Sequence, residues 1–190
     1  AGNFAFANRS TLTQRLRNIL REEIRLDSDL EVIYDVSHNI AKIENHKVHG
    51  VSCECCVHRK GATRALGGDH SELAGKFSGI GQPVLVPGDM GTASWILSGP
   101  ESGGNDAFSS SCHGAGRKLS RTAARNSIDS VKLMKSLEEK GIYVNVKTPN
   151  VLSEEAPEAY KNVDEVIELT HKAELARPVA RLRPFAVIKG

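Results

Sequence analysis

Apolar residues recur at helical spacing in three stretches of the chain. Charged residues separate the apolar side chains of residues 11–26 (Leu12, Leu16, Ile19, Leu20 and Ile24), which predicts an amphipathic helix. Residues 130–140 and 163–173 predict two more helices, and the first of these is expected to stop at Gly141, because glycine readily takes the left-handed conformation that ends many helices. A short helix is also expected over residues 118–125.

Short apolar runs bounded by glycine, proline or polar residues predict strands. They lie at residues 31–36, 51–58, 84–86, 93–97, 143–146 and 185–188. Residues 40–43 could form a helical turn or a strand, the polar residues 44–50 predict a turn, and residues 67–81 and 99–106 predict loops. Helices and strands mixed in this way favour an α+β or irregular α/β domain, and we expect the α+β class, with mixed sheets and surrounding helices.

The composition narrows the class of protein. The chain has 190 residues, 39% apolar and 25% charged, which suits one soluble globular domain without a membrane-spanning segment. Its net charge of +2 gives no overall nucleic-acid signature, although basic residues group locally. Three of the four cysteines (Cys53, Cys55, Cys56 and Cys112) crowd into four positions, which is no disulfide framework and predicts a reducing, cytoplasmic location. The chain starts with Ala1, so we expect an upstream part to be missing.

One histidine stands beside a turn suited to phosphate. His113 is followed by Gly114, Ala115 and Gly116 and then by Arg117. Glycines let a backbone approach a ligand closely, and an arginine can hold a phosphate with two hydrogen bonds. The imidazole would then be a nucleophile or an acid–base group beside a phosphate. A tight loop with a histidine of no chemical role explains the same residues equally well.

Four other motifs have both a functional and an ordinary explanation. Residues 87–94 form a glycine-rich connection that could cradle a base or phosphate, but taken alone they are better explained as a hairpin turn. The basic residues at 57–64 suit nucleic-acid phosphates or a solvated turn. His38 lacks metal-ligand partners nearby in the sequence, so a polar core histidine explains it better than a metal ligand does. The spacing from Cys53 to His58 does not fit a zinc site, because neighbouring residues of a strand point to opposite faces.

Taken together and in order, these segments resemble the family of RtcB-type RNA-splicing ligases. The matching segments are residues 5–9, 34–42, 57–64, 87–94, 111–117, 156–160, 180–184 and 187–190. The likeness runs the length of the chain, and the family's chains are much longer. The resemblance therefore implies that residues 1–190 are the C-terminal part of a single RtcB-like catalytic domain whose N-terminal half is absent.

The resemblance implies an activity. Members of the family use GTP and Mn²⁺ to join RNA ends bearing a 2′,3′-cyclic phosphate or 3′-phosphate to a 5′-hydroxyl, in tRNA splicing and RNA repair. His113 would be the nucleophile that takes GMP from GTP and passes it to the RNA 3′-phosphate, and His38 would be a metal ligand. The positions that match nucleotide contacts are Asn39, Pro87, Gly88, Asp89, Met90, Ser94, His113, Gly114, Ala115, Gly116 and Lys189. The expected RNA-phosphate contacts are Lys60, Arg64, Arg117 and Arg121.

The chain departs from the family pattern in two ways. Asp89 stands where the family usually has serine, and its carboxylate would repel a phosphate but could accept hydrogen bonds from guanine. The family's other metal ligands, an aspartate, a cysteine and two histidines, lie upstream, so we expect the chain alone not to assemble a two-metal site. A partner chain carrying the N-terminal half could supply them. The alternatives are a non-catalytic RNA- or nucleotide-binding module derived from the ligase, and a fragment that exposes apolar surface.

Overall fold

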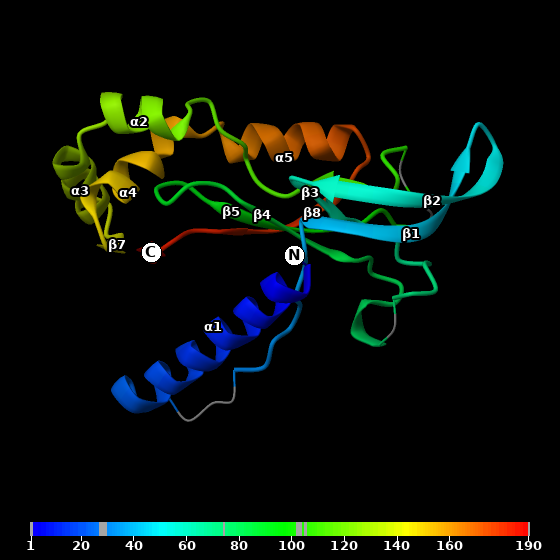
Figure 1. Cartoon of the computed structure of the whole chain (residues 1–190), viewed down its shortest axis with the longest axis horizontal. Helices are drawn as coiled ribbons and strands as arrows, with labels where there is room; N and C mark the ends of the chain where they lie inside the picture. The colour runs from blue at the N-terminus through cyan, green and yellow to red at the C-terminus, as the bar shows by residue number, and fades with distance from the viewer. Residues whose placement is uncertain (1, 27–29, 74, 102–103, 105, 190) are drawn as a thin grey trace. The chain divides into compact units, whose positions relative to one another are not determined.

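The computed structural model describes residues 2–26, 30–73, 75–101, 104 and 106–189 (Figure 1). Only the backbone is described for Pro149, Ile188 and Lys189. The chain divides into two compact units, residues 1–60 and residues 61–190, and each is described by itself. Helices and small sheets occur together, which confirms the expected α+β class. Among the described residues, no helix is both long enough and apolar enough to cross a membrane.

The first unit contains a long helix and a hairpin. Helix α1 (Gly2–Glu23) confirms the predicted amphipathic helix. It begins at Gly2, nine residues before the predicted start at residue 11. Strands β1 (Asn39–Val48) and β2 (Val51–Lys60) pair antiparallel, from Asn39 opposite Lys60 to Val48 opposite Val51. The two residues between the strands have positive φ angles of 49° and 80°, which suits the tight turn of a two-residue hairpin.

Two predictions in this unit are wrong. Residues 31–36 form no strand, and the side chains of Val32 and Ile33 are 49% and 69% exposed, because no strand in the part of the chain that the structure describes pairs with this apolar run. The predicted turn at residues 44–50 is instead mostly strand, since all of β1 finds hydrogen-bonding partners in β2, and only two residues turn. The open choice for residues 40–43 resolves to strand for the same reason.

The second unit contains three small sheets. Strands β4 (Pro83–Pro87), β5 (Ser94–Ser98) and β8 (Arg177–Leu182) form an antiparallel sheet in that order. Strand β3 (Ala62–Arg64) pairs antiparallel with β6 (Ser110–Cys112), and β7 (Tyr143–Val146) pairs parallel with β9 (Ala186–Lys189). The strands predicted at residues 84–86, 93–97, 143–146 and 185–188 are confirmed, whereas β3, β6 and β8 were not predicted.

The helices of the second unit begin at polar caps. Helices α2 (Arg121–Ser127), α3 (Ser130–Glu139) and α5 (Val163–Lys172) are capped by the side chains of Ser120, Asp129 and Asn162. All three were predicted to within a few residues, and Gly141 has the expected positive φ of 74°. Helix α4 (Pro149–Glu154) and the 3₁₀ turn η2 (Pro157–Ala159) were missed. The described residues of the predicted loop at 67–81 confirm it apart from the 3₁₀ turn η1 (Gly75–Phe77), and residue 74 lies outside the described residues. Residues 102, 103 and 105 of the predicted loop at 99–106 also lie outside them.

Two apolar clusters hold this unit together. Figure 1 shows α5 lying along the sheet of β4, β5 and β8, and the first cluster fills the space between them with Val84, Val86, Leu97, Val163 and Ile167 among its members. The second cluster joins α3, α4 and β7. It includes Met90, from the loop between β4 and β5, so this loop is anchored in the core.

Candidate active site

His113 directly follows the short strand β6. Its strand pairs with β3, and this pairing brings the imidazole to Gly61, the residue before β3. A Cβ atom built on Gly61 would lie 3.4 Å from Nε2 of His113, and Gly61 has a φ of +70°. A glycine at this position therefore lets the backbone run close beside the imidazole without strain.

The turn after His113 is held against the end of strand β4. The N–H of Ala115 donates to the carbonyl oxygen of Pro87 at 3.0 Å, and the Ala115 side chain is buried. A Cβ atom at Gly114 would lie 3.4 Å from the same carbonyl oxygen. The structure thus brings together two motifs that lie 26 residues apart, from Pro87 to His113, and that the sequence indicated only separately.

The loop between β4 and β5 is tightly folded. The N–H of Gly88 donates to the carbonyl oxygen of Ala93 at 3.0 Å, and a Cβ atom at Gly88 would lie 2.1 Å from that oxygen. Asp89 braces the loop, because Oδ1 accepts from the N–H of Gly91 at 2.8 Å and Oδ2 accepts from Oγ1 of Thr92 at 2.7 Å. Its carboxylate therefore has a structural task that a serine could perform only in part.

Two other expected nucleotide contacts are constrained by the fold. The Met90 side chain is 4% exposed and packs in the second apolar cluster, so only the backbone of this residue can meet a nucleotide. Ser94 is half-buried at the start of β5, opposite Pro87 on one side and Leu182 on the other. Lys189 ends β9 opposite Val146, and its side chain lies outside the described residues.

Arg117, expected at an RNA phosphate, makes contacts within the protein. Its Nε donates to the carbonyl oxygen of Leu119 at 3.0 Å, and its terminal nitrogens donate to the hydroxyl of Tyr160 at 2.9 Å and to the carbonyl oxygen of Glu154 at 2.5 Å. Burial, followed by the neighbouring Glu155 carboxylate, raises the pKa of Tyr160 above its ordinary value of 10.0. Tyr160 is therefore a neutral hydroxyl at physiological pH.

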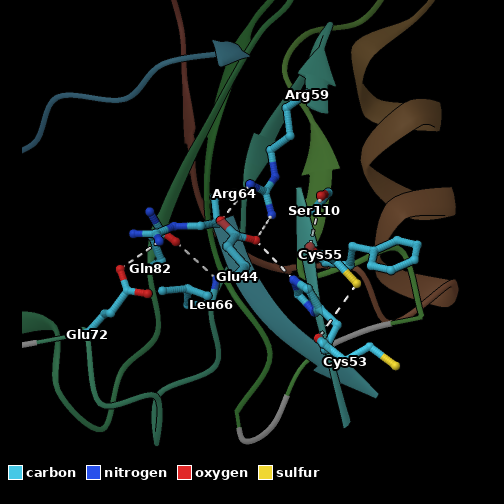
Figure 2. A network of polar contacts seen from close by, with 11 residues as sticks. Glu44, Cys53, Cys55, Arg59, Arg64, Leu66, Glu72, Gln82 and Ser110 are labelled. Atoms are coloured by element: carbon cyan, nitrogen blue, oxygen red, sulfur yellow. Dashed lines mark hydrogen bonds and ion pairs between the residues drawn. The ribbon is translucent and has the colours of Figure 1, made fainter. Parts of the chain in front are cut away.

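The other expected phosphate ligands of the second unit are Arg64 and Arg121. Arg64 donates to the Glu72 carboxylate at 2.7 Å, and its side chain is 15% exposed. Figure 2 shows this ion pair together with the hydrogen bond from the Leu66 N–H to Gln82. Arg121 is 69% exposed and lies 3.5 Å from a Glu154 carboxylate oxygen. The ion pair of Arg121 is solvent-exposed and weak, so Arg121 could exchange a carboxylate for a phosphate at little cost, whereas the Arg64 side chain is largely buried.

The first unit groups three of the expected site residues at the open end of its hairpin. His38 is exposed immediately before β1, and Asn39 begins β1 directly opposite Lys60, the last residue of β2. Arg59 and Glu44 form a buried pair with two hydrogen bonds of 2.8 Å (Figure 2). This pair fixes one face of the hairpin and leaves the other face, which bears Asn39 and Lys60, exposed.

The cysteines are free thiols and do not form a metal centre in the part of the chain that the structure describes. No group of three or more His, Cys, Asp or Glu side chains there could hold a metal ion. Cys55 donates to the Cys53 carbonyl oxygen at 3.7 Å (Figure 2), whereas Cys56 on the opposite face lies 3.4 Å from Nε2 of His58. The thiols of the cluster are thus divided between two faces, as strand alternation predicts.

Three residues of this site carry no recognisable signal as isolated positions in the sequence. Gly61, Glu155 and Tyr160 were not assigned a role, although Tyr160 ends one of the segments that carries the family resemblance. The sequence signal was a tyrosine just after the Ala-Pro-Glu-Ala segment at 156–159, but the arginine it meets lies 43 residues away. Only pairing of the two segments in the fold reveals this contact.

Comparison with known proteins identifies the family. The family model for "tRNA-splicing ligase RtcB" matches residues 1–190. The chain is 47% identical over 193 aligned residues to the tRNA-splicing ligase RtcB of Thermococcus kodakarensis and 45% identical over 193 residues to that of Archaeoglobus fulgidus. It is 46% identical over 194 residues to that of Pyrococcus furiosus. All of this chain is covered in each case, but only 40%, 40% and 20% of the respective relatives. The chain therefore belongs to the tRNA-splicing ligase RtcB family.

Proposed function

We propose that this chain carries the nucleotide-transfer part of a GTP-dependent RNA ligase. The ligase would join RNA ends bearing a 2′,3′-cyclic phosphate or 3′-phosphate to 5′-hydroxyl ends, in tRNA splicing and RNA repair. Membership of the family supports this assignment, because its relatives are named tRNA-splicing ligases. We place the reaction in the cytoplasm, where free thiols such as the four cysteines persist.

His113 is the nucleophile in this proposal. Its neutral imidazole attacks the α-phosphate of GTP, a P–N bond forms, and pyrophosphate leaves. Water first opens a 2′,3′-cyclic phosphate to a 3′-phosphate. The GMP then passes from His113 to the RNA 3′-phosphate, and the His113 ring is restored when the P–N bond breaks. Attack of the RNA 5′-hydroxyl on the activated phosphate forms the new phosphodiester and releases GMP.

The observation that supports this proposal most strongly is the hydrogen bond between Ala115 and Pro87. It holds the histidine turn against the glycine-rich loop, so backbone groups of both motifs can surround one ligand. Asn39, Pro87, Gly88, Asp89, Met90, Ser94, Gly114, Ala115, Gly116 and Lys189 are proposed to contact the guanylate. Because both Asp89 oxygens already accept hydrogen bonds within the loop, we propose that this carboxylate shapes the pocket wall and faces away from the phosphates.

Manganese does not fit the described residues alone, because no three potential ligands come together there. We propose that His38 contributes one ligand and that the remaining ligands come from the upstream half, supplied in the same protein or by a partner chain. The chain alone is then inactive in ligation. RNA phosphates would be held by Lys60 and Arg121, whose side chains are exposed, and by Arg64, which would exchange the Glu72 carboxylate for a phosphate.

Labelling of His113 tests the proposal. The chain is incubated with α-labelled GTP and Mn²⁺, with and without the upstream half, and resolved on a denaturing gel. We expect acid-labile label only when the upstream half is present, and loss of at least 100-fold of the label in His113→Ala, since no other group replaces the nucleophile. His171→Ala, an exposed histidine on α5, is the matched control and should label like the wild type.

The runner-up function is a binding module without catalysis. The absence of a group of metal ligands among the described residues favours it. In that case a folded chain mixed with the upstream half would bind RNA or guanine nucleotide but acquire no label. Label that persists in His113→Ala would also contradict the proposed role of this residue.

A further inference from the structure

The backbone directly after the His113 turn, residues 116–119, pairs with a second segment, residues 154–161. The N–H of Lys118 donates to the carbonyl oxygen of Ala159 at 2.8 Å, and the N–H of Lys161 donates to that of Gly116 at 2.9 Å. Arg117 and Tyr160 face each other in this short antiparallel bridge. The backbone after His113 therefore depends for its position on residues more than 40 positions further along the chain.

The Arg117 side chain strengthens this pairing. Each of its three guanidinium nitrogens donates to a protein oxygen, at Leu119, Tyr160 and Glu154. Its Cζ atom also lies 4.7 Å from the centre of the Tyr160 ring, within range of a cation–π contact. Three of its five N–H groups are therefore engaged within the protein, and the side chain is only 25% exposed, so a phosphate would have to compete with these contacts.

Tyr160 and Glu155 complete the arrangement. The hydroxyl of Tyr160 accepts from Arg117 and donates to Oε2 of Glu155 at 2.5 Å. Oε1 of Glu155 lies 3.6 Å from the guanidinium, so the three side chains form a closed ring of charge and hydrogen bonds. Cooperative polar networks of this kind fix geometry more strongly than separate pairs do.

We propose that Arg117, Tyr160 and Glu155 form a clamp that positions the His113 turn, and that Arg117 is a positioning residue and not an RNA-phosphate ligand. The consequence for catalysis rests on the proposed function, whereas the clamp itself does not. Arg121 is more accessible than Arg117, because its side chain is 69% exposed against 25%, and its ion pairs to Glu154 and Glu155 measure 3.5 and 3.9 Å. Phosphate binding at this end of the unit is therefore assigned to Arg121.

The first test measures amide hydrogen exchange in the 190-residue chain and needs no activity. In Arg117→Lys and Tyr160→Phe, we expect the amides of Lys118 and Lys161 to exchange about five-fold faster, as loss of one hydrogen bond predicts. Amides of helix α3, such as that of Leu137, should be unchanged. Tyr143→Phe is the matched control, because this tyrosine is 78% exposed. Wild-type exchange at Lys118 and Lys161 in both clamp variants would overturn the proposal.

The second test separates positioning from phosphate binding, with the upstream half supplied. Arg117→Lys should lower the rate of His113 labelling about ten-fold while leaving the KM for GTP and the Kd for RNA unchanged, because a misplaced nucleophile slows the chemical step. Arg121→Lys should instead weaken RNA binding. A weaker RNA affinity in Arg117→Lys, with normal labelling, would overturn the positioning role. If the wild type takes no label, the proposed function fails, and hydrogen exchange alone decides the clamp.

Discussion

The structural roles of several single residues in this protein depend on their neighbours in the fold and not on residue type alone. Gly88 must lack a side chain because a Cβ atom there would collide with the Ala93 carbonyl, whereas Gly61 leaves room for the His113 ring. Asp164 ties three elements together, since it accepts from Nε1 of Trp95 at 2.7 Å and from two nitrogens of Arg181 at 3.0 and 2.9 Å. The hydrogen bonds from Arg181 and then Trp95 lower the pKa of this carboxyl below its ordinary 3.8.

Asp164→Asn should lower the free energy of unfolding by about 1 kcal/mol at pH 7, a modest loss because the Asp164 side chain is 45% exposed and its ion pair is screened. A lowered folded-state pKa stabilises the protein above pH 3.8, and this contribution is lost as the pH falls through the folded-state value. Urea unfolding followed by the fluorescence of Trp95, the chain's one tryptophan, should show wild type and variant converging in acid. A constant difference down to pH 3, or an equal loss in Glu165→Gln, would contradict this role.

At the scale of elements, the two faces of the β1–β2 hairpin differ in burial: one carries a buried ion pair and the other is exposed. Glu44 and Arg59 lie on one face with side chains 7% and 1% exposed, whereas Glu54, opposite Asn45, lies on the exposed face. His46 lies 3.0 Å from the same Glu44 carboxylate. A buried cation is tolerated only with its hydrogen-bonded partner, so this pair sets the register of the hairpin.

Glu44→Gln should lower the free energy of unfolding by about 3 kcal/mol, because the buried guanidinium of Arg59 would keep its charge and lose its counterion. Glu54→Gln is the matched control and should change stability by less than about 0.5 kcal/mol. Chemical denaturation followed by circular dichroism measures both. Equal effects of the two substitutions would show that the Glu44–Arg59 pair contributes little.

At the scale of the whole molecule, helix α1 leaves an apolar stripe exposed to solvent. Helix α1 has no buried residue, and Leu12, Leu16 and Ile19 on one stripe are 55%, 49% and 55% exposed. The chain also spans only 40% of the length of its Thermococcus kodakarensis relative. Stripes of this kind usually pack against another protein surface, and in their absence they promote self-association.

The double substitution Leu16→Gln and Ile19→Gln should therefore reduce self-association of the 190-residue chain several-fold, as measured by sedimentation velocity. The free energy of unfolding should change by less than about 1 kcal/mol, because the wild-type side chains are already exposed. Arg15→Gln with Glu22→Gln, on exposed polar positions of the same helix, is the control. Unchanged association, or a large loss of stability, would mean that the stripe is not a free contact surface.

The sequence by itself determined the α+β class, the helices with strong apolar periodicity or polar caps, and the two glycine-rich motifs around Pro87 and His113. These features depend on local signals such as periodicity, caps and turn residues, which act over a few positions. Resemblance to the RtcB family extended them to a set of site residues, and the comparisons confirmed the family.

Only the tertiary structure decided which segments meet. The run at residues 31–36 looks like a strand but pairs with no other strand among the described residues, whereas the polar residues 44–48 are strand because β2 supplies their hydrogen bonds. The short strands β3 and β6 exist only through each other, and Arg117 meets Tyr160 across 43 residues of chain. Pairing of this kind depends on contacts between distant segments, and no local pattern of hydrophobic and polar residues encodes it.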